Sequence, residues 1–170
     1  HAVEWLSNQT FYSLALDETV SFDVVLPTGY STSTWDYPVV YLLHGRDQNY
    51  RVWREDSILL PEMTNRPMVV VLPNAGNTWY MNQTAVMVAE ELPMHVEGTW
   101  RVSNQRGIGG LSMGGYGAFY LAGAMSQKYY ASVSSMSGAF VDPTVALILD
   151  GVTTRSRVSL AAALAPKAAP

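Results

Sequence analysis

The sequence predicts an α/β fold, a doubly wound and mostly parallel sheet with helices on its two faces. Two continuous apolar runs, Val39–Leu43 and Met68–Leu72, are typical of strands that are covered on both sides, as in parallel sheets. Segments with helical character separate such runs, and this alternation forms right-handed βαβ units. The 170 residues suit one domain of this kind.

The first half of the chain contains the expected elements in a regular order. The first 30 residues alternate only loosely, apart from a short strand over 22–26. A helix is expected over 52–65, with a break or a late restart near Pro61. An amphipathic helix is expected over 84–99, where Pro93 interrupts it.

The second half continues the alternation and then changes character. A strand of small residues is expected over 106–111, a helix over 113–125 and a further strand over 130–136. Residues 152–170 are biased toward Ala and Pro and have no strand pattern, so we expect an atypical tail, either a short terminal helix or a vector-derived or frame-shifted segment. The expected domain therefore covers residues 1–151.

The composition excludes several classes of protein. A hydrophobic fraction of 48% with only 14% charged residues excludes an intrinsically disordered chain. The net charge is −4 and the ten Lys and Arg residues are scattered, so we expect no nucleic-acid partner. There is no cysteine, which excludes disulfides, thiolate metal sites and cysteine nucleophiles. No His, Asp or Glu cluster has metal-ligand spacing, and we expect neither a metal nor a cofactor.

The chain also lacks the patterns of membrane insertion and export. No apolar run approaches the ~18 residues of a membrane span, so we expect none. Residues 1–8 have no basic segment followed by an apolar core, so we expect no signal peptide. This favours a cytoplasmic location, although a chain without thiols is compatible with either side of a membrane.

The strongest chemical signal is Gly110-Leu111-Ser112-Met113-Gly114, a G-x-S-x-G pattern between a predicted strand and a predicted helix. A nucleophile on such a tight turn takes strained backbone angles, and its small neighbours leave room for the turn to close. The Ser112 hydroxyl would project at the positive end of the following helix. We therefore predict Ser112 as a nucleophile; the alternative is a Gly-rich helix start with an incidental serine.

A second signal is Leu43-His44-Gly45-Arg46, at the end of an earlier buried strand. Acyl transfer needs two backbone N–H groups directed at the developing oxyanion. We expect one from Met113, directly after the serine, and the other from Arg46. The alternative is that the His-Gly turn only ends the strand.

These residues together resemble the esterase D family of α/β-hydrolases, which includes S-formylglutathione hydrolases, acetyl, tributyrin and feruloyl esterases, and mycolyltransferases. The resemblance covers residues 11–143 and is carried most specifically by Gly109–Ala118. It implies an α/β-hydrolase-type sheet whose last strands and helices are missing, with Ser112 as nucleophile and Met113 and Arg46 as oxyanion donors. Family members more often have an apolar residue where Arg46 stands. The other anchors are Asp23–Pro27, Tyr37–Gly45, Val70–Asn74, Glu90–Pro93 and Ser137–Ala139.

The acid and the base of this family do not stand where its chain order requires them. That order is Ser, then Asp or Glu, then His. All three histidines precede Ser112, and the only acids after it are Asp142 and Asp150. We name His44 and His95 as candidates for a substitute base.

Aromatic residues and a sheet edge complete the expectations. Trp53, Trp79 and Tyr80 follow strand ends, where loops line the ligand crevice of such sheets, so we expect them in a substrate pocket. The alternative is that they cover the core. Strand 130–136 is expected to leave an open edge, which pairs with a second copy of the chain or is covered by residues 144–165.

The resemblance implies a serine carboxylic-ester hydrolase that acts on short acyl or aryl esters through an acyl-enzyme. Its partner would be a small-molecule ester. Two alternatives stay open. One is a catalytically incomplete α/β-hydrolase fragment that binds or assembles without efficient turnover. The other is a compact variant with an improvised base.

Overall fold

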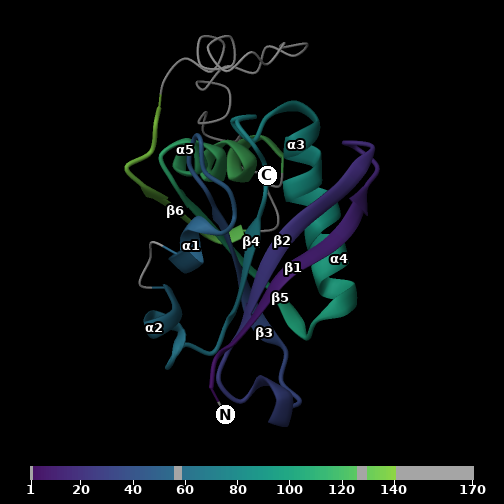
Figure 1. The fold of residues 1–170 in the computed structure, drawn as a ribbon, viewed down its shortest axis with the longest axis vertical. Coiled ribbons are helices and arrows are strands. Elements are labelled where there is room, and N and C mark those ends of the chain that lie inside the picture. Colours follow the sequence, from purple (N-terminus) through teal and green to yellow (C-terminus); the bar gives the residue numbers. More distant parts are fainter. Residues whose placement is uncertain (1, 56–58, 126–129, 141–170) are drawn as a thin grey trace, which may run out of the picture.

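The computed structural model describes residues 2–55, 59–125 and 130–140, and within them six strands form one sheet in the order β1-β2-β4-β3-β5-β6 (Figure 1). The strands are β1 (Glu4–Ser13), β2 (Glu18–Leu26), β3 (Tyr37–Leu43), β4 (Val69–Pro73), β5 (Val102–Leu111) and β6 (Tyr130–Met136). The helices are η1 (Tyr30–Thr32), α1 (Val52–Glu55), α2 (Leu59–Met63), α3 (Asn82–Val86), η2 (Met87–Glu91), α4 (Leu92–Thr99), α5 (Met113–Tyr120) and η3 (Leu121–Met125).

The sheet is parallel at its centre and antiparallel at one end. The strands β4, β3, β5 and β6 run parallel to one another, while β2 pairs antiparallel with both β1 and β4. The carboxyl ends of the four parallel strands therefore lie at one edge of the sheet. This mostly parallel α/β sheet confirms the expected fold class.

Helices cover both faces of the sheet, as its apolar strands require (Figure 1). Along β4, Val69 and Val71 join a core cluster with α4 and α5, whereas Val70 and Leu72 join a second cluster with α1 and α2. Successive strand residues point to opposite faces. A strand with a core on each side must be apolar at every position, which is why the β4 run does not alternate.

The first strand, β1, is not predicted by the loose alternation of the N-terminal residues. Its pairing with β2 shifts register between Leu6 and Gln9, and Asn8 has φ 54° at that point. Such a bulge moves the following side chains to the other face of the strand. The period of two is therefore lost over the whole segment, although each half of β1 keeps it.

The expected interruption at Pro93 is wrong. The helical backbone runs from α3 through η2 into α4, and Pro93 lies in the first turn of α4. The preceding turn, Met87–Glu91, is π-helical. A π turn changes the hydrogen-bond spacing locally, so the N–H that proline lacks does not end the helix.

The described part of the segment 52–65 forms α1 and α2, and Pro61 lies in the first turn of α2, where a helix leaves its N–H groups without an internal acceptor. Residues 56–58, between the two helices, lie outside the described residues, so the expected break near Pro61 stays a prediction. The tail 152–170, Asp142, Asp150 and the covering segment 144–165 lie outside the described residues. Among the described helices, none has the length and apolar character needed to cross a membrane.

Candidate active site

Ser112 is the single residue between β5 and α5, and its backbone angles are φ 55° and ψ −113°. Residues with a side chain rarely adopt these angles. Its N–H donates to the Met136 carbonyl (3.0 Å), and its own carbonyl accepts from the N–H groups of Tyr116 (3.1 Å) and Ala139 (3.0 Å). Hydrogen bonds from the end of β6 and from α5 therefore hold Ser112 in its strained conformation. A strained residue persists only where its surroundings fix it in this way.

The two glycines of the pattern allow this turn to pack against the end of β3. A Cβ on Gly114 would lie 2.1 Å from the Leu43 carbonyl oxygen and 2.7 Å from that of His44. A Cβ on Gly110 would lie 2.3 Å from the Gly114 oxygen. No side chain fits at either position. The close approach brings the loop after β3 directly beside the turn that carries Ser112.

The loop after β3 has a tightly fixed backbone. The Gly45 carbonyl lies 2.8 Å from Nδ1 of His44 and accepts from the Gln48 N–H at 3.3 Å. In a trans peptide the C=O and N–H groups point in opposite directions. The Arg46 N–H shares this peptide unit, so the two hydrogen bonds to Gly45 fix its direction. The Met113 N–H, at the start of α5, belongs to the N–H groups that a helix leaves free for a ligand.

His44 is fully buried, and both of its ring nitrogens are engaged. The Ala75 N–H donates to Nε2 (3.0 Å), so Nε2 carries a lone pair and Nδ1 carries the proton that it donates to Gly45. Burial lowers the pKa of His44, which favours this neutral form. His44 therefore has no ring nitrogen available to accept a proton from Ser112. The role of base that the sequence suggested for it does not fit this geometry.

His95 lies at the other end of the molecule. Its ring stacks on Phe11, with centroids 5.2 Å apart, and contacts the edge of Trp100 at 6.2 Å. Trp100 precedes β5 and Ser112 follows it, so the strand separates them by roughly 30 Å at ~3.3 Å per residue. His95 is too far from Ser112 to act as its base, and this second candidate does not fit either.

The three aromatic residues expected in a substrate pocket are core residues. Trp53, Trp79 and Tyr80 are 8%, 6% and 0% exposed. Trp53 belongs to the cluster under α1 and α2. Trp79 packs edge-on against Tyr116 with centroids 5.8 Å apart. The alternative interpretation, that these aromatic side chains cover the core, therefore applies to all three residues, because the loops that carry them fold inward.

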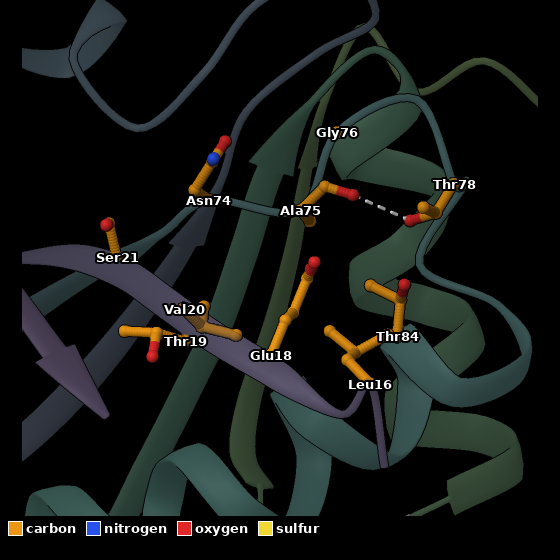
Figure 2. Close-up of a pocket in the computed structure, with 10 residues that line it drawn as sticks. All are labelled: Leu16, Glu18, Thr19, Val20, Ser21, Asn74, Ala75, Gly76, Thr78 and Thr84. Carbon is orange, nitrogen blue, oxygen red and sulfur yellow. Dashed lines mark hydrogen bonds between the residues drawn. The ribbon is translucent and has the colours of Figure 1, made fainter. Parts of the chain in front are cut away.

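A polar hollow of about 320 Å³ lies at the same edge of the sheet, between the start of β2 and the loop after β4 (Figure 2). Its lining includes Glu18, Thr78, Ala75 and Thr84. The Thr78 hydroxyl donates to the Ala75 carbonyl (2.9 Å), and the Ala75 N–H holds His44. Sequence reasoning missed this hollow because its walls come from segments that are far apart in the chain.

No metal centre accompanies these groups in the part of the chain that the structure describes. No three His, Asp or Glu side chains there lie close enough together to hold a metal ion.

The strand order, the strained serine between β5 and α5, and the adjoining loop after β3 together define a protein of the α/β-hydrolase class. The family model described as "Putative esterase" matches residues 13–167, and the chain belongs to this esterase family.

Two curated relatives are similar in sequence. An esterase of Mycobacterium tuberculosis is 34% identical over 145 residues, which cover 75% of this chain and 31% of that protein. An acetyl esterase of Caldicellulosiruptor saccharolyticus is 26% identical over 147 residues, covering 77% of this chain and 55% of that protein. The chain thus spans about a third and about half of the length of these relatives.

Solved structures share the fold. A ferulic acid esterase superposes with a TM-score of 0.74 at 26% identity, over 89% of this chain and 68% of that one. An S-formylglutathione hydrolase from Agrobacterium tumefaciens has a TM-score of 0.72 at 21% identity, over 82% and 61%. The family match and these neighbours confirm the resemblance to esterase D-type hydrolases.

Proposed function

We propose that this chain carries the nucleophile and the oxyanion-binding loop of a serine carboxylic-ester hydrolase. The observation that supports this most is the backbone of Ser112, at φ 55° and ψ −113° beside the loop after β3. A strained serine is costly to maintain, and such strain gathers at functional sites. Membership of the esterase family supports the same reaction class.

The proposed reaction proceeds through an acyl-enzyme. The Ser112 Oγ attacks the ester carbonyl carbon while its proton passes to a base, and the carbonyl oxygen becomes an oxyanion that accepts hydrogen bonds from the Met113 and Arg46 N–H groups. The C–O bond to the alcohol then breaks and the alcohol leaves with the proton. Water attacks the acyl-enzyme in the same way, which releases the carboxylic acid and restores the serine.

The proposed substrates are small esters with a short acyl or an aryl acyl group. This choice follows the family resemblance, and two similar proteins have names that agree with it, an acetyl esterase and a ferulic acid esterase. Both acyl groups place one flat carbonyl at the serine, where two N–H donors can reach its oxygen.

A second candidate function follows from the two described histidines. His44 has both ring nitrogens engaged, and His95 lies at the far end of β5. Without a base, a serine is a weak nucleophile, although oxyanion stabilisation alone retains ~10³–10⁴-fold of catalysis over water. The chain would then bind esters without efficient turnover.

The deciding experiment compares the wild-type chain with Ser112→Ala. Hydrolysis of p-nitrophenyl acetate is followed for both, and a fluorophosphonate probe is mapped by mass spectrometry. Labelling of Ser112 with hydrolysis that the substitution abolishes supports the esterase. Labelling without turnover supports the second candidate. Equal rates for both proteins and no label on Ser112 would contradict the nucleophile.

A further inference from the structure

Tyr80 connects the loop after β3 to the helix that follows Ser112. It is fully buried, and its hydroxyl donates to the His44 carbonyl at 2.8 Å. Its ring lies against Gly117 of α5, where an added Cβ would be only 2.4 Å from a Tyr80 ring carbon. One side chain therefore contacts both halves of the candidate site.

The backbone that carries Tyr80 is strained. Trp79 and Tyr80 have φ values of 56° and 55°, a region that bulky residues avoid. The Tyr80 N–H donates to the Thr78 hydroxyl at 3.3 Å, and Trp79 packs edge-on against Tyr116 of α5. Two consecutive strained aromatic residues persist only where the surrounding contacts determine them, and such residues gather at functional sites.

The acceptor of the Tyr80 hydroxyl lies one peptide unit before the N–H group of Arg46. The His44 carbonyl and the Gly45 N–H belong to one peptide unit, whose N–H donates to Oε1 of Gln48 at 2.9 Å. The next peptide unit contains the Arg46 N–H. The two units share the Cα of Gly45, so the hydrogen bonds at the C=O and N–H of the first unit hold the point from which the Arg46 unit extends.

A phenylalanine would fill the same space, so packing does not explain the hydroxyl. Burial raises the pKa of Tyr80 well above its ordinary value, which keeps the hydroxyl protonated and able to donate at neutral pH. Most buried hydroxyls have a hydrogen-bond partner, and this one has its acceptor on the loop rather than on its own element.

We propose that Tyr80 is a positioning residue, which holds the His44 peptide and thereby fixes the distance and direction of the oxyanion loop relative to Ser112. This inference rests on the proposed function, because it assigns Tyr80 a role in the same reaction.

The test compares Tyr80→Phe with Tyr41→Phe. Tyr41 is also fully buried, on β3, and its hydroxyl has no hydrogen-bond partner among the described residues. The rate constant for phosphonylation of Ser112 by a fluorophosphonate is normalised to the final amount of labelled Ser112. Unfolded protein does not react, so it does not alter this rate constant. The kcat and KM for p-nitrophenyl acetate and the hydrogen exchange of the Arg46 amide are measured on the same proteins.

We expect Tyr80→Phe to lower the phosphonylation rate and kcat by ~10–100-fold, because misplaced oxyanion donors cost about that much. KM should change little, exchange at Arg46 should become faster, and Tyr41→Phe should behave as wild type. Equal behaviour of the two variants, or a loss confined to KM, would overturn the role of Tyr80. If the wild type is not labelled, the proposed function fails instead, and the exchange rate at Arg46 still decides whether Tyr80 holds the loop.

Discussion

His44 illustrates how a single residue can look like a catalytic group in the sequence and have another task in the structure. It directly follows β3 and precedes the glycine of the loop, so the sequence allows it as a base. Its ring instead joins two backbone segments, by accepting from Ala75 and donating to Gly45. Only the three-dimensional contacts distinguish these roles, since Ala75 is 31 positions away in the chain.

The neutral state of His44 makes stability depend on pH. Burial lowers the pKa of folded His44 below the ~6.5 of an unfolded histidine, so the unfolded chain binds a proton more readily. The contribution of neutral His44 to the free energy of unfolding is therefore expected to be complete above pH ~6.5. As the pH falls below that value, the free energy of unfolding should decrease by at most ~1.4 kcal/mol per pH unit. Denaturant unfolding between pH 5 and 8 measures this.

The matched variant for this prediction is His44→Gln, which cannot titrate in that range. The difference between the two proteins isolates the contribution of His44 from that of other groups. Parallel pH profiles for wild type and variant would show that His44 is not the source.

At the level of elements, the sequence predicted most of the sheet. β3, β4 and β6 lie where their patterns indicated, whereas β2 and β5 each begin four residues earlier, at Glu18 and Val102, than the expected 22 and 106. The strand β1 was missed because its bulge shifts the alternation, and Pro93 misled because a π turn precedes it. Both misses are local departures from regular hydrogen bonding, which residue patterns do not record.

The packing of α5 on β3 leads to a prediction about Gly114. In Gly114→Ala the new Cβ would meet the backbone oxygens of Leu43 and His44, which cannot move aside as a side chain could. We expect a loss of roughly 1–3 kcal/mol in the free energy of unfolding, as for overpacked cores, together with slower labelling of Ser112. Chemical denaturation and the fluorophosphonate rate measure the two effects.

Gly98→Ala is the matched control. Gly98 lies in α4, and an added Cβ there would meet nothing within 4 Å. Because alanine is the better helix former, this variant should be as stable as wild type or more stable by up to ~1 kcal/mol. Similar losses in both variants would contradict the close contact between α5 and β3.

For the molecule as a whole, the sequence indicated the candidate reactive groups better than it indicated the residues that pack around them. The G-x-S-x-G pattern is local, so Ser112 and Met113 could be named from it, and Arg46 from the end of β3. The pocket assignment of Trp53, Trp79 and Tyr80 could not be judged from the sequence, because burial depends on how distant segments pack. The hydrogen bond from Tyr80 to His44 has no sequence signal at all.

The position of β6 leads to a prediction at the scale of the whole molecule. The strand β6 is an edge strand, which pairs with β5 on one side. Among the described residues, no strand pairs with its other side. We propose that this edge pairs with a second copy or is covered by residues 144–165. Analytical ultracentrifugation and amide exchange should show dimers or protected β6 amides. A monomer whose outer β6 amides exchange freely would contradict this.

The most direct test of the central claim is a crystal structure of the chain after reaction with a small alkyl fluorophosphonate, whose adduct resembles the tetrahedral intermediate. We expect a covalent bond from phosphorus to the Ser112 Oγ, with the phosphoryl oxygen ~2.7–3.1 Å from the backbone nitrogens of both Met113 and Arg46. An adduct on another residue, or a phosphoryl oxygen that contacts neither nitrogen, would contradict it.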